Sequence, residues 1–284
     1  MRNLRIALLV FFGVVSVLFT IAYVRERMTT DYGAPVIHAD SDTLAVSVSS
    51  GDEDLLAGMT AHDNLDGDVT DSLAVVSKSK FISKGTLRVN YAAFDSSRNV
   101  GTYSREVTYT DYVSPRFRMD TPLRFASGGS LPDYLEHITA QDCLDGDLTR
   151  QVKITTGKTT VVSDSVTRQK VNIQVTNSCG DNAALELTVS MEDYTTLNRP
   201  APALRDYVLY VEKGGELDLM GNVTGVWAGG VARGFAEMGY TPEDVSVNEG
   251  VLNLQIPGTY TVTYQLSRDG ADLGTAELIV VVEG

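Results

Sequence analysis

The chain has 284 residues, of which 37 are acidic and 23 are basic, so its formal net charge at pH 7 is −14 and its isoelectric point is about 4.6. This charge argues against nucleic-acid binding, which needs a basic face, and against docking on anionic lipid. The length allows two or three domains. Glycine, threonine, valine and tyrosine are plentiful and helix-forming runs are scarce beyond residue 30, so we predict an all-β protein.

An uncharged apolar run, IALLVFFGVVSVLFTIAYV, occupies residues 6–24. At 1.5 Å per residue, a helix of this length spans about 28 Å, close to the thickness of the hydrocarbon core of a bilayer. The alternative is a cleaved signal peptide, but its apolar core is usually about 7–15 residues long and ends at a cleavage site between small residues. The run ends instead in YVRER, so we expect residues 1–29 to form a short tail and an uncleaved membrane anchor.

The orientation of this anchor does not follow from charge alone. Arg2 and Arg5 precede the run and Arg25 and Arg27 follow it, so the positive-inside rule favours neither side. Two cysteines farther along the chain favour an oxidising compartment for the remaining residues. We therefore expect a single-pass protein of the cell membrane, with a cytoplasmic N-terminus and extracellular C-terminal domains.

The sequence DNLDGD at residues 63–68 recurs nearly unchanged as DCLDGD at residues 142–147, and an aliphatic residue and a threonine follow each copy. The period of about 80 residues is longer than that of solenoid repeats, typically about 20–50 residues. It fits tandem small β domains. We place these domains at residues 33–112, 113–193 and 198–284.

Short stretches of alternating apolar and polar residues run through all of the predicted domains. A period of two is typical of strands that bury one face, and turn-forming residues separate the stretches at the intervals expected for a β-sandwich. The clearest stretches are 44–48, 87–93 and 103–109 in the first domain, 171–175 and 185–189 in the second, and 207–211, 252–256 and 276–282 in the third.

Three segments of the first domain, AHDNLDGDVT at 61–70, KGTLRVNY at 84–91 and FDSSRN at 94–99, together resemble a family of bacterial immunoglobulin-like domains. That family occurs in tandem in surface proteins of Gram-positive bacteria. Its pattern is Ala-x-Asp-x-x-Asp-Gly-Asp, then Gly-Thr-Tyr-x-Val-x-Tyr, then x-Asp-x-x-Gly-Asn. The chain departs from the pattern at Leu87, where tyrosine is usual, and at Arg98, where glycine is usual. The resemblance implies three tandem immunoglobulin-like β-sandwich domains that act as surface spacers or adhesion units.

Two interpretations of the acidic loops remain open. In the first, each loop is a tight turn in which glycine takes a positive φ and the aspartates accept hydrogen bonds from nearby backbone amides. In the second, the carboxylates gather around a hard cation such as Ca²⁺, which is the candidate cofactor. The loop is not an EF-hand, because the closing glutamate is missing. The candidate ligands are Asp63, Asp66, Asp68 and Asp95 of the first domain and Asp142, Asp145 and Asp147 of the second.

The two cysteines of the chain, Cys143 and Cys179, take the places of Asn64 and Ser97 when the repeats are aligned. These places lie in two loops that we expect to face each other at one end of the sandwich. A disulfide between them is therefore predicted, and two buried thiols are the alternative.

A second exchange accompanies the cysteines. Asn177 takes the place of Asp95, which leaves the second copy with fewer carboxylates at the same end of the domain. We hypothesise that the first copy ties its loops together with a cation or hydrogen bonds, whereas the second uses sulfur.

The third domain lacks the acidic loop, and a glycine-rich segment there carries Trp227, Phe235 and Tyr240. Aromatic residues on a loop of the outermost domain are typical of a ligand-binding tip. The alternative is that Trp227, the one tryptophan of the chain, fills the core of this domain.

No catalytic motif or pairing of a nucleophile with a base emerges from the sequence, so we expect a protein that is not an enzyme. The predicted function is a membrane-anchored extracytoplasmic stalk, adhesion or interaction module with a protein or glycan ligand. Two alternatives remain. One is a membrane subunit that recruits other membrane proteins during envelope assembly or signalling, and the other is a carbohydrate-binding surface protein.

Overall fold

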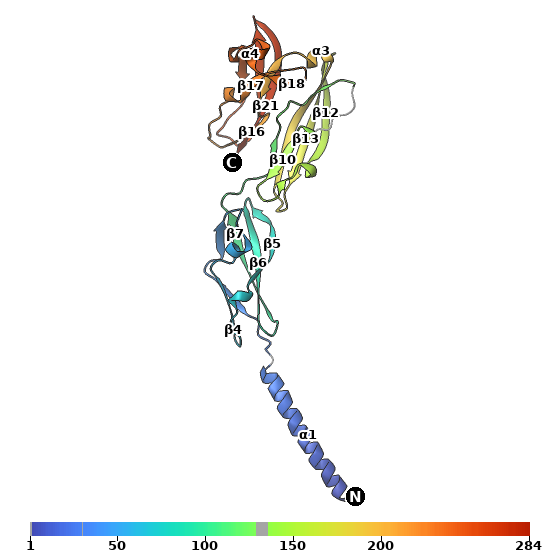
Figure 1. Cartoon of the computed structure of the whole chain (residues 1–284), viewed down its shortest axis with the longest axis vertical. Helices are drawn as coiled ribbons and strands as arrows, with labels where there is room; N and C mark the ends of the chain where they lie inside the picture. Colours follow the sequence, from blue (N-terminus) through green and yellow to red (C-terminus); the bar gives the residue numbers. More distant parts are fainter. Residues whose placement is uncertain (1, 30, 129–135) are drawn as a thin grey trace. The chain divides into compact units, whose positions relative to one another are not determined.

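The computed structural model describes residues 2–29, 31–128 and 136–284. The chain divides into two compact units, a first unit that ends at Tyr112 and a second unit that runs from Val113 to Gly284. Apart from one long helix, both units are built mainly from strands (Figure 1). This agrees with the all-β composition of the sequence.

Helix α1 (Arg2–Thr29), drawn in dark blue in Figure 1, contains the apolar run. Its segment Asn3–Glu26 is long and apolar enough to cross a membrane, and none of its most apolar window is buried against another part of the chain. Leu9, Phe12 and Phe19 are 71%, 69% and 70% exposed. The helix therefore differs from an amphipathic surface helix, which buries an apolar stripe against the core.

The β-strands of the first unit form two sheets. One has the order β2 (Thr43–Val46), β7 (Val100–Tyr109), β6 (Thr86–Phe94) and β5 (Ala74–Ser83), and the other has the order β1 (Val36–Ala39), β3 (Met59–Asp63) and β4 (Gly67–Asp68). The edge strand β2 runs parallel to β7, whereas the other neighbours are antiparallel. The short helices α2 (Asp52–Leu55) and η1 (Thr70–Ser72) lie in the connections.

The core of the first unit follows from the alternation of its strands. Leu87, Val89 and Tyr91 on β6 are fully buried, because every second residue of a strand points to the same face. Arg105 of β7 is buried with them. Its Nε donates to the Tyr91 hydroxyl at 3.1 Å, and its other nitrogens donate to the backbone carbonyls of Ala57 and Leu55. These acceptors allow a charged side chain to be buried.

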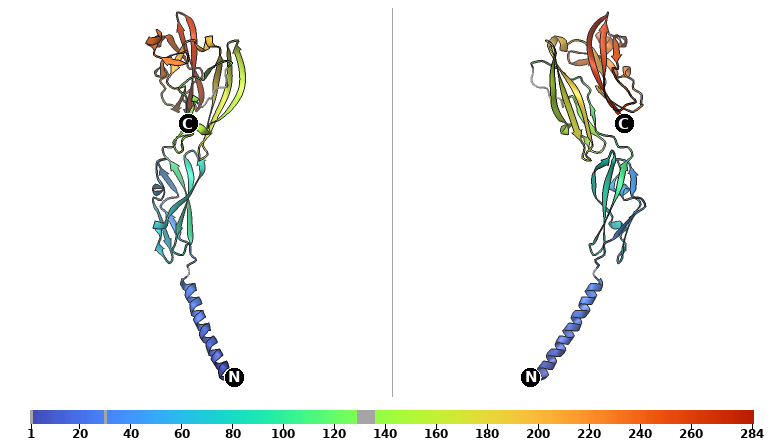
Figure 2. Two further views of the ribbon diagram at one scale, coloured as in Figure 1. Left: turned by 45° about the vertical axis from the view of Figure 1, so that its right-hand side comes forward. Right: turned by 180° about the vertical axis from the view of Figure 1, so that it is seen from behind.

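The second unit contains the same strand arrangement twice, and the two copies appear as separate groups of strands in both views of Figure 2. The first pair of sheets has the orders β12 (Lys153–Ser163), β13 (Val166–Thr176), β14 (Asn182–Glu192), β9 (Arg124–Ala126) and β11 (Gly146–Asp147), β10 (Thr139–Asp142), β8 (Arg116–Arg118). The second pair has the orders β16 (Val208–Glu212), β21 (Ala271–Glu283), β20 (Gly258–Arg268), β19 (Val245–Asn248) and β15 (Ala201–Leu204), β17 (Val223–Ala228), β18 (Val231–Arg233). The edge strands β9 and β16 are parallel to their neighbours, as β2 is in the first unit.

The short helices of the second unit lie between these strands. They are η3 (Thr149–Gln151), α3 (Tyr194–Leu197), η4 (Met220–Asn222), α4 (Phe235–Met238) and η5 (Pro242–Asp244). Asp193 caps α3, where its side chain accepts a hydrogen bond from the Thr196 amide at 2.7 Å. The cap ends β14 and turns the chain toward β15.

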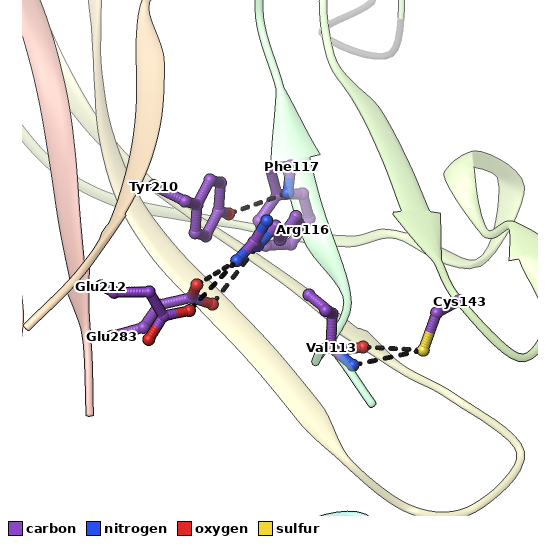
Figure 3. A network of polar contacts seen from close by, with 7 residues as sticks. All are labelled: Val113, Arg116, Phe117, Cys143, Tyr210, Glu212 and Glu283. Atoms are coloured by element: carbon purple, nitrogen blue, oxygen red, sulfur yellow. Dashed lines mark hydrogen bonds and ion pairs between the residues drawn. The ribbon is translucent and has the colours of Figure 1, made fainter. Parts of the chain in front are cut away.

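The two sandwiches of the second unit pack directly on each other. The Tyr210 hydroxyl accepts a hydrogen bond from the Phe117 amide at 2.8 Å, and the Tyr207 amide donates to the Met119 carbonyl at 2.7 Å. Figure 3 shows the first of these bonds beside an ion pair between Arg116 and Glu283. Burial raises the pKa of Tyr210 to about 12, so this hydroxyl stays neutral at physiological pH. One apolar core cluster extends through both sandwiches.

A four-stranded sheet with a parallel edge strand and a three-stranded sheet thus occur together three times along the chain. The predicted fold class, an all-β chain of β-sandwiches after one N-terminal helix, is confirmed by this arrangement. The boundaries 33–112, 113–193 and 198–284 stay a prediction, because the chain separates into only two compact units.

Candidate functional site

The first acidic loop is a turn between β3 and β4. Asp63 at the end of β3 accepts hydrogen bonds through its Oδ1 atom from the amides of Leu65 at 2.8 Å and Asp66 at 3.0 Å. Gly67 follows with a φ of 75°, which glycine adopts without steric cost. The Oδ1 atom of Asp63 therefore holds the turn closed, and its second oxygen, Oδ2, takes no part in these hydrogen bonds.

The other two aspartates of this loop have different partners. Both oxygens of Asp66 accept hydrogen bonds from Ser96, one from its amide at 2.6 Å and one from its hydroxyl at 2.9 Å. The loop after β6 thus lies against the acidic loop, as the sequence predicted. Asp68 accepts a hydrogen bond at 2.9 Å from the amide of Thr70, the first residue of η1.

Asp63 lies instead in a cluster with Asp95 and Asp31. One oxygen from each of these carboxylates lies within 4.8 Å of the others, and the side chains are 1%, 7% and 8% exposed. Asp95 accepts hydrogen bonds from the Asn99 amide at 2.7 Å and its side chain at 2.6 Å. Asp31, which precedes β1, accepts one from the Gly33 amide at 2.8 Å. The Asn99 side chain also donates to the Asp31 carbonyl at 3.1 Å.

No ion pair among the described residues balances the negative charge of this cluster. The Oδ2 atoms of Asp31 and Asp63 are buried and accept no hydrogen bond from the residues that the structure describes. The ion pairs among those residues include none of the three carboxylates. Hydrogen bonds from the Asp66 and Leu65 amides hold the pKa of Asp63 below its ordinary value and favour its ionised form.

The second acidic loop repeats the turn but not the cluster. Asp142 accepts hydrogen bonds through Oδ1 from the Leu144 and Asp145 amides, both at 2.9 Å. Its Oδ2 atom accepts a hydrogen bond from the side-chain amide of Asn177 at 3.2 Å. The Asn177 side-chain oxygen in turn accepts the Asp181 amide at 2.9 Å. An amide therefore stands where the first copy has the Asp95 carboxylate.

The remaining aspartates of the second loop copy their counterparts. Asp145 accepts hydrogen bonds from the Ser178 amide at 2.6 Å and hydroxyl at 2.7 Å, and Asp147 accepts one from the Thr149 amide at 2.9 Å. The structure thus brings together two of the predicted ligands, Asp63 and Asp95, and gives the others roles in the turns. The residues in those other roles are Asp66, Asp68, Asp142, Asp145 and Asp147.

Sequence reasoning missed Asp31, although the sequence holds a signal for it. Asp31 stands four residues before Pro35, and Asp111 stands four residues before Pro115, so the segment that leads into each of the first two domains begins alike. The two aspartates nevertheless differ in their contacts. Asp111 accepts a hydrogen bond from the Ser47 hydroxyl at 2.7 Å in the first unit, which also lowers its pKa.

The predicted disulfide is absent from this structure: Cys143 and Cys179 are not bonded to each other. The Cys143 thiol instead donates to the Val113 carbonyl at 3.0 Å and accepts the Val113 amide at 3.4 Å (Figure 3). The sulfur is therefore directed to the backbone at the start of the second unit.

The aromatic residues of the third sandwich lie in and beside its three-stranded sheet. Trp227 lies on β17 and is half-buried, so it neither stands on an exposed loop tip nor fills the deepest core. Phe235 and Tyr240 pack against the core cluster, and the Arg268 guanidinium lies over the Tyr240 ring at 5.1 Å from its centre. These packing contacts account for Phe235 and Tyr240 without a ligand.

A cleft of about 560 Å³ lies in the second unit, with Leu123, Leu187 and Ile279 among the residues of its wall. Six charged side chains of the wall form three ion pairs and neutralise each other locally, and Arg199 is a further charged residue of the wall. These pairs are Arg124 with Glu192 at 2.6 Å, Lys170 with Glu186 at 2.9 Å and Arg168 with Glu277 at 3.7 Å.

Similarity to known proteins is limited to distant matches among solved structures. No family model matches the chain, and no curated protein matches its sequence. A solved structure of the CBM51-2 and INT domains of Clostridium perfringens ZmpB, in complex with GlcNAc, is 18% identical with a TM-score of 0.23. That match covers 55% of this chain and 41% of the other.

Two further structures are similarly distant. The M60 catalytic domain of the same Clostridium perfringens protein with its CBM51-1 and CBM51-2 domains is 12% identical, with a TM-score of 0.22, and the match covers 89% of this chain and 31% of the other. Drosophila N-cadherin EC1-4 is 12% identical with a TM-score of 0.21, over 90% of this chain and 76% of the other. The chain thus spans less than half the length of the two Clostridium structures.

Proposed function

We propose that the chain is a membrane-anchored surface module that holds its β-sandwich domains outside the cell membrane as a stalk, adhesion or interaction unit. Helix α1 would cross the membrane once, with its N-terminus in the cytoplasm. The proposal includes a non-catalytic role, membership of the bacterial immunoglobulin-like domains described from the sequence motifs, and a protein or glycan ligand.

The observation that carries the proposal is the exposed apolar surface of α1. Its 24-residue segment Asn3–Glu26 corresponds to about 36 Å of helix, more than the roughly 30 Å of a bilayer core. Large apolar side chains remain exposed along this length, among them Leu9, Phe12 and Phe19. Lipid would cover them, whereas water would leave a large apolar surface hydrated.

The domains beyond α1 support a role in which shape matters more than chemistry. The same strand topology occurs three times along the chain, as expected of a protein built from repeated structural modules. The strong acidity of the chain favours solubility and repels other anionic surfaces. Together these features support a spacer or interaction module over a nucleic-acid or lipid-surface protein.

Two measurements on a pair of fusion proteins test the anchor and its orientation. The full chain is expressed in bacteria with alkaline phosphatase, which is active only after export, fused after Gly284, and a matched chain carries a fluorescent protein that matures only in the cytoplasm. We expect phosphatase activity, no fluorescence, and a membrane-bound product with an intact N-terminus by mass spectrometry. A product cleaved after α1 and released from the membrane would contradict the anchor, and fluorescence of the second fusion would contradict the orientation.

A further inference from the structure

We propose that Asp31, Asp63 and Asp95 form a calcium site that fastens the segment before β1 to the first β-sandwich. The inference concerns the first unit alone and does not depend on the orientation of α1. It extends the proposed function by giving the module a dependence on a divalent cation.

The buried carboxylate oxygens of Asp31 and Asp63 are the first evidence for the site. Asp31 Oδ2 and Asp63 Oδ2 are both buried, and the described residues supply neither with a hydrogen-bond donor. A buried carboxylate oxygen that lacks both a donor and a counter-charge is strongly unfavourable. Protein groups already satisfy the other oxygens of these two side chains, so the two Oδ2 atoms are the ones left for a cation.

The second argument is the spacing of the ligands. Two oxygens that each lie about 2.4 Å from one calcium ion can be at most about 4.8 Å apart. One oxygen from each of the three carboxylates lies within 4.8 Å of the others, which is inside this limit. The donors are all carboxylate oxygens, which suit a hard cation, whereas zinc prefers nitrogen and sulfur. Magnesium requires a stricter octahedral geometry than side chains from three separate segments readily provide.

The three candidate ligands come from separate segments of the first unit. Asp31 precedes β1, Asp63 ends β3 and Asp95 follows β6, so a shared ion would join three segments that are distant in the sequence. Asn99 already links two of them, because its side chain donates to the Asp31 carbonyl and to the Asp95 carboxylate. A cation bound by the three carboxylates would link all three segments and balance their negative charge.

The segment before β1 also lies very close to β7, which supports its attachment to the first sandwich. A Cβ atom placed on Gly101 of β7 would lie 1.9 Å from the Pro35 carbonyl oxygen. The backbone of the segment therefore rests directly on the strand, and only glycine leaves the space. This contact brings the residues that follow Asp31 onto the sandwich.

The second domain supplies an internal control. There Asn177 takes the place of Asp95, and its amide satisfies the Oδ2 atom of Asp142 at 3.2 Å. The same turn is therefore stable without a cation when a donor replaces one carboxylate. It follows that the first copy, which has a third acid and no such donor, is the copy that needs the ion.

A shared proton is the alternative to a cation. A proton held between Asp31 and Asp63 would also satisfy their two buried oxygens, because the two carboxylates lie in the same cluster. The two explanations predict opposite responses. A cation site gains stability from calcium near neutral pH, whereas a shared proton gains stability from mild acid and is indifferent to calcium.

The test uses the full chain in a non-ionic detergent, freed of divalent cations, and calcium chloride as the probe. Isothermal titration is expected to give one calcium ion per chain, with a dissociation constant between about 10⁻⁴ and 10⁻³ M, the range of extracellular calcium-binding modules. Asp63→Asn and Asp95→Asn should each weaken binding at least tenfold. Asp68→Asn, which removes the same charge outside the cluster, and Asp142→Asn in the second copy should leave binding unchanged.

Thermal unfolding locates the ion in the molecule. Trp227, the one tryptophan, lies in the second unit, so its fluorescence follows that unit, whereas calorimetry follows both units. Calcium at about one hundred times its dissociation constant should raise the calorimetric transition of the first unit by several degrees and leave the tryptophan transition in place.

Four results would overturn the proposal. The first is the absence of binding at calcium concentrations up to ten times about 10⁻³ M, and the second is unchanged calcium binding in both Asp63→Asn and Asp95→Asn. The third is an affinity for magnesium equal to that for calcium. The fourth is a first unit that is stabilised at pH 5 but not by calcium. Asp95→Asn should still fold, because asparagine occupies the corresponding place in the second domain. Its loss of binding therefore cannot be ascribed to unfolding if the calorimetric transition remains.

Discussion

The two acidic turns have the same backbone and the same first set of hydrogen bonds, yet they treat one oxygen differently. Asp63 and Asp142 each accept two backbone amides through Oδ1. The Oδ2 atom of Asp142 then accepts the Asn177 side-chain amide, whereas that of Asp63 has no donor among the described residues and its carboxylate lies beside those of Asp31 and Asp95. The difference teaches that the DxxDGD motif specifies the turn, while residues outside the motif decide whether the turn also becomes a cation site.

The largest expected difference in stability between the first two domains arises where the segment before each domain contacts its sandwich. Gly101 and Ala183 occupy matching positions, because each pairs with the residue two places before Asp95 or Asn177. Gly101→Ala would force a methyl group against the Pro35 carbonyl and should destabilise the first unit by about 1–3 kcal/mol. It should also weaken calcium binding. The measurement is calorimetry with and without calcium.

The matched control for this change is Ala183→Gly in the second domain. It should cost no more than about 0.5–1 kcal/mol, the usual price of glycine in a strand. Equal effects of the two substitutions would contradict the special closeness of Pro35 to β7.

The next largest effect on stability is expected when Asp95 and Asn177, which occupy the same place in the two copies, are exchanged. Without calcium, Asn177→Asp should destabilise the second unit by about 1–2 kcal/mol, because it removes the donor from Asp142 Oδ2 and adds a like charge. Asp95→Asn should leave the stability of the calcium-free first unit within about 1 kcal/mol of the original, since the donor that it offers to Asp63 Oδ2 is offset by the lost acceptor of the Asn99 side chain. Chemical denaturation measures both free energies of unfolding. If Asn177→Asp leaves the calcium-free second unit unchanged, the Asn177 amide does not account for the difference between the two copies.

A smaller effect concerns the mobility of the segment that holds Asp31. Tyr32 is 81% exposed, and Tyr112 occupies the corresponding place before the second domain. Chymotrypsin should cut after Tyr32 several-fold more slowly when calcium is present, because opening the segment then requires release of the ion. Cleavage after Tyr112 should not respond. Equal slowing at both sites would indicate an effect of calcium on the protease or on the whole chain.

The smallest effect should be equal in the two copies. Hydrogen bonds from Thr70 and Thr149 lower the pKa of Asp68 and of Asp147 below the ordinary value. A carboxyl with a lowered folded pKa contributes its stability above the unfolded pKa of about 4 and loses it as the pH falls through the folded pKa. Unfolding temperatures should therefore drop below about pH 4. Asp68→Asn and Asp147→Asn should each reduce that drop by a similar amount, and a reduction in only one variant would break the equivalence of the turns.

The sequence predicted most of the fold because the relevant signals are local. Alternation along segments such as 87–93 marks a buried strand face, and the repeated DxxDGD turn marks the period. The packing of the last two sandwiches was not predictable in this way. It depends on contacts between residues far apart in the sequence, such as Arg116 with Glu283, that no periodicity announces.

The candidate site was predictable in part for the same reason. Asp63 and Asp95 lie in loops that the repeat aligns, so their proximity could be inferred from the repeat. Asp31 lies in an irregular segment whose position is set by contacts with Asn99 and β7, and only the structure reveals them. The disulfide failed as a prediction because alignment gives the positions of Cys143 and Cys179 but not the directions of their side chains.

The most direct test of the account is a crystal structure of the chain grown with calcium, with the ion located by its anomalous scattering. The account predicts one calcium ion bound by Asp31, Asp63 and Asp95 at about 2.4 Å from their oxygens, and no ion beside Asp142 and Asn177. An Asp31–Asp63 pair within hydrogen-bond distance and no anomalous peak would contradict it, and would identify the cluster as a protonated pair of acids.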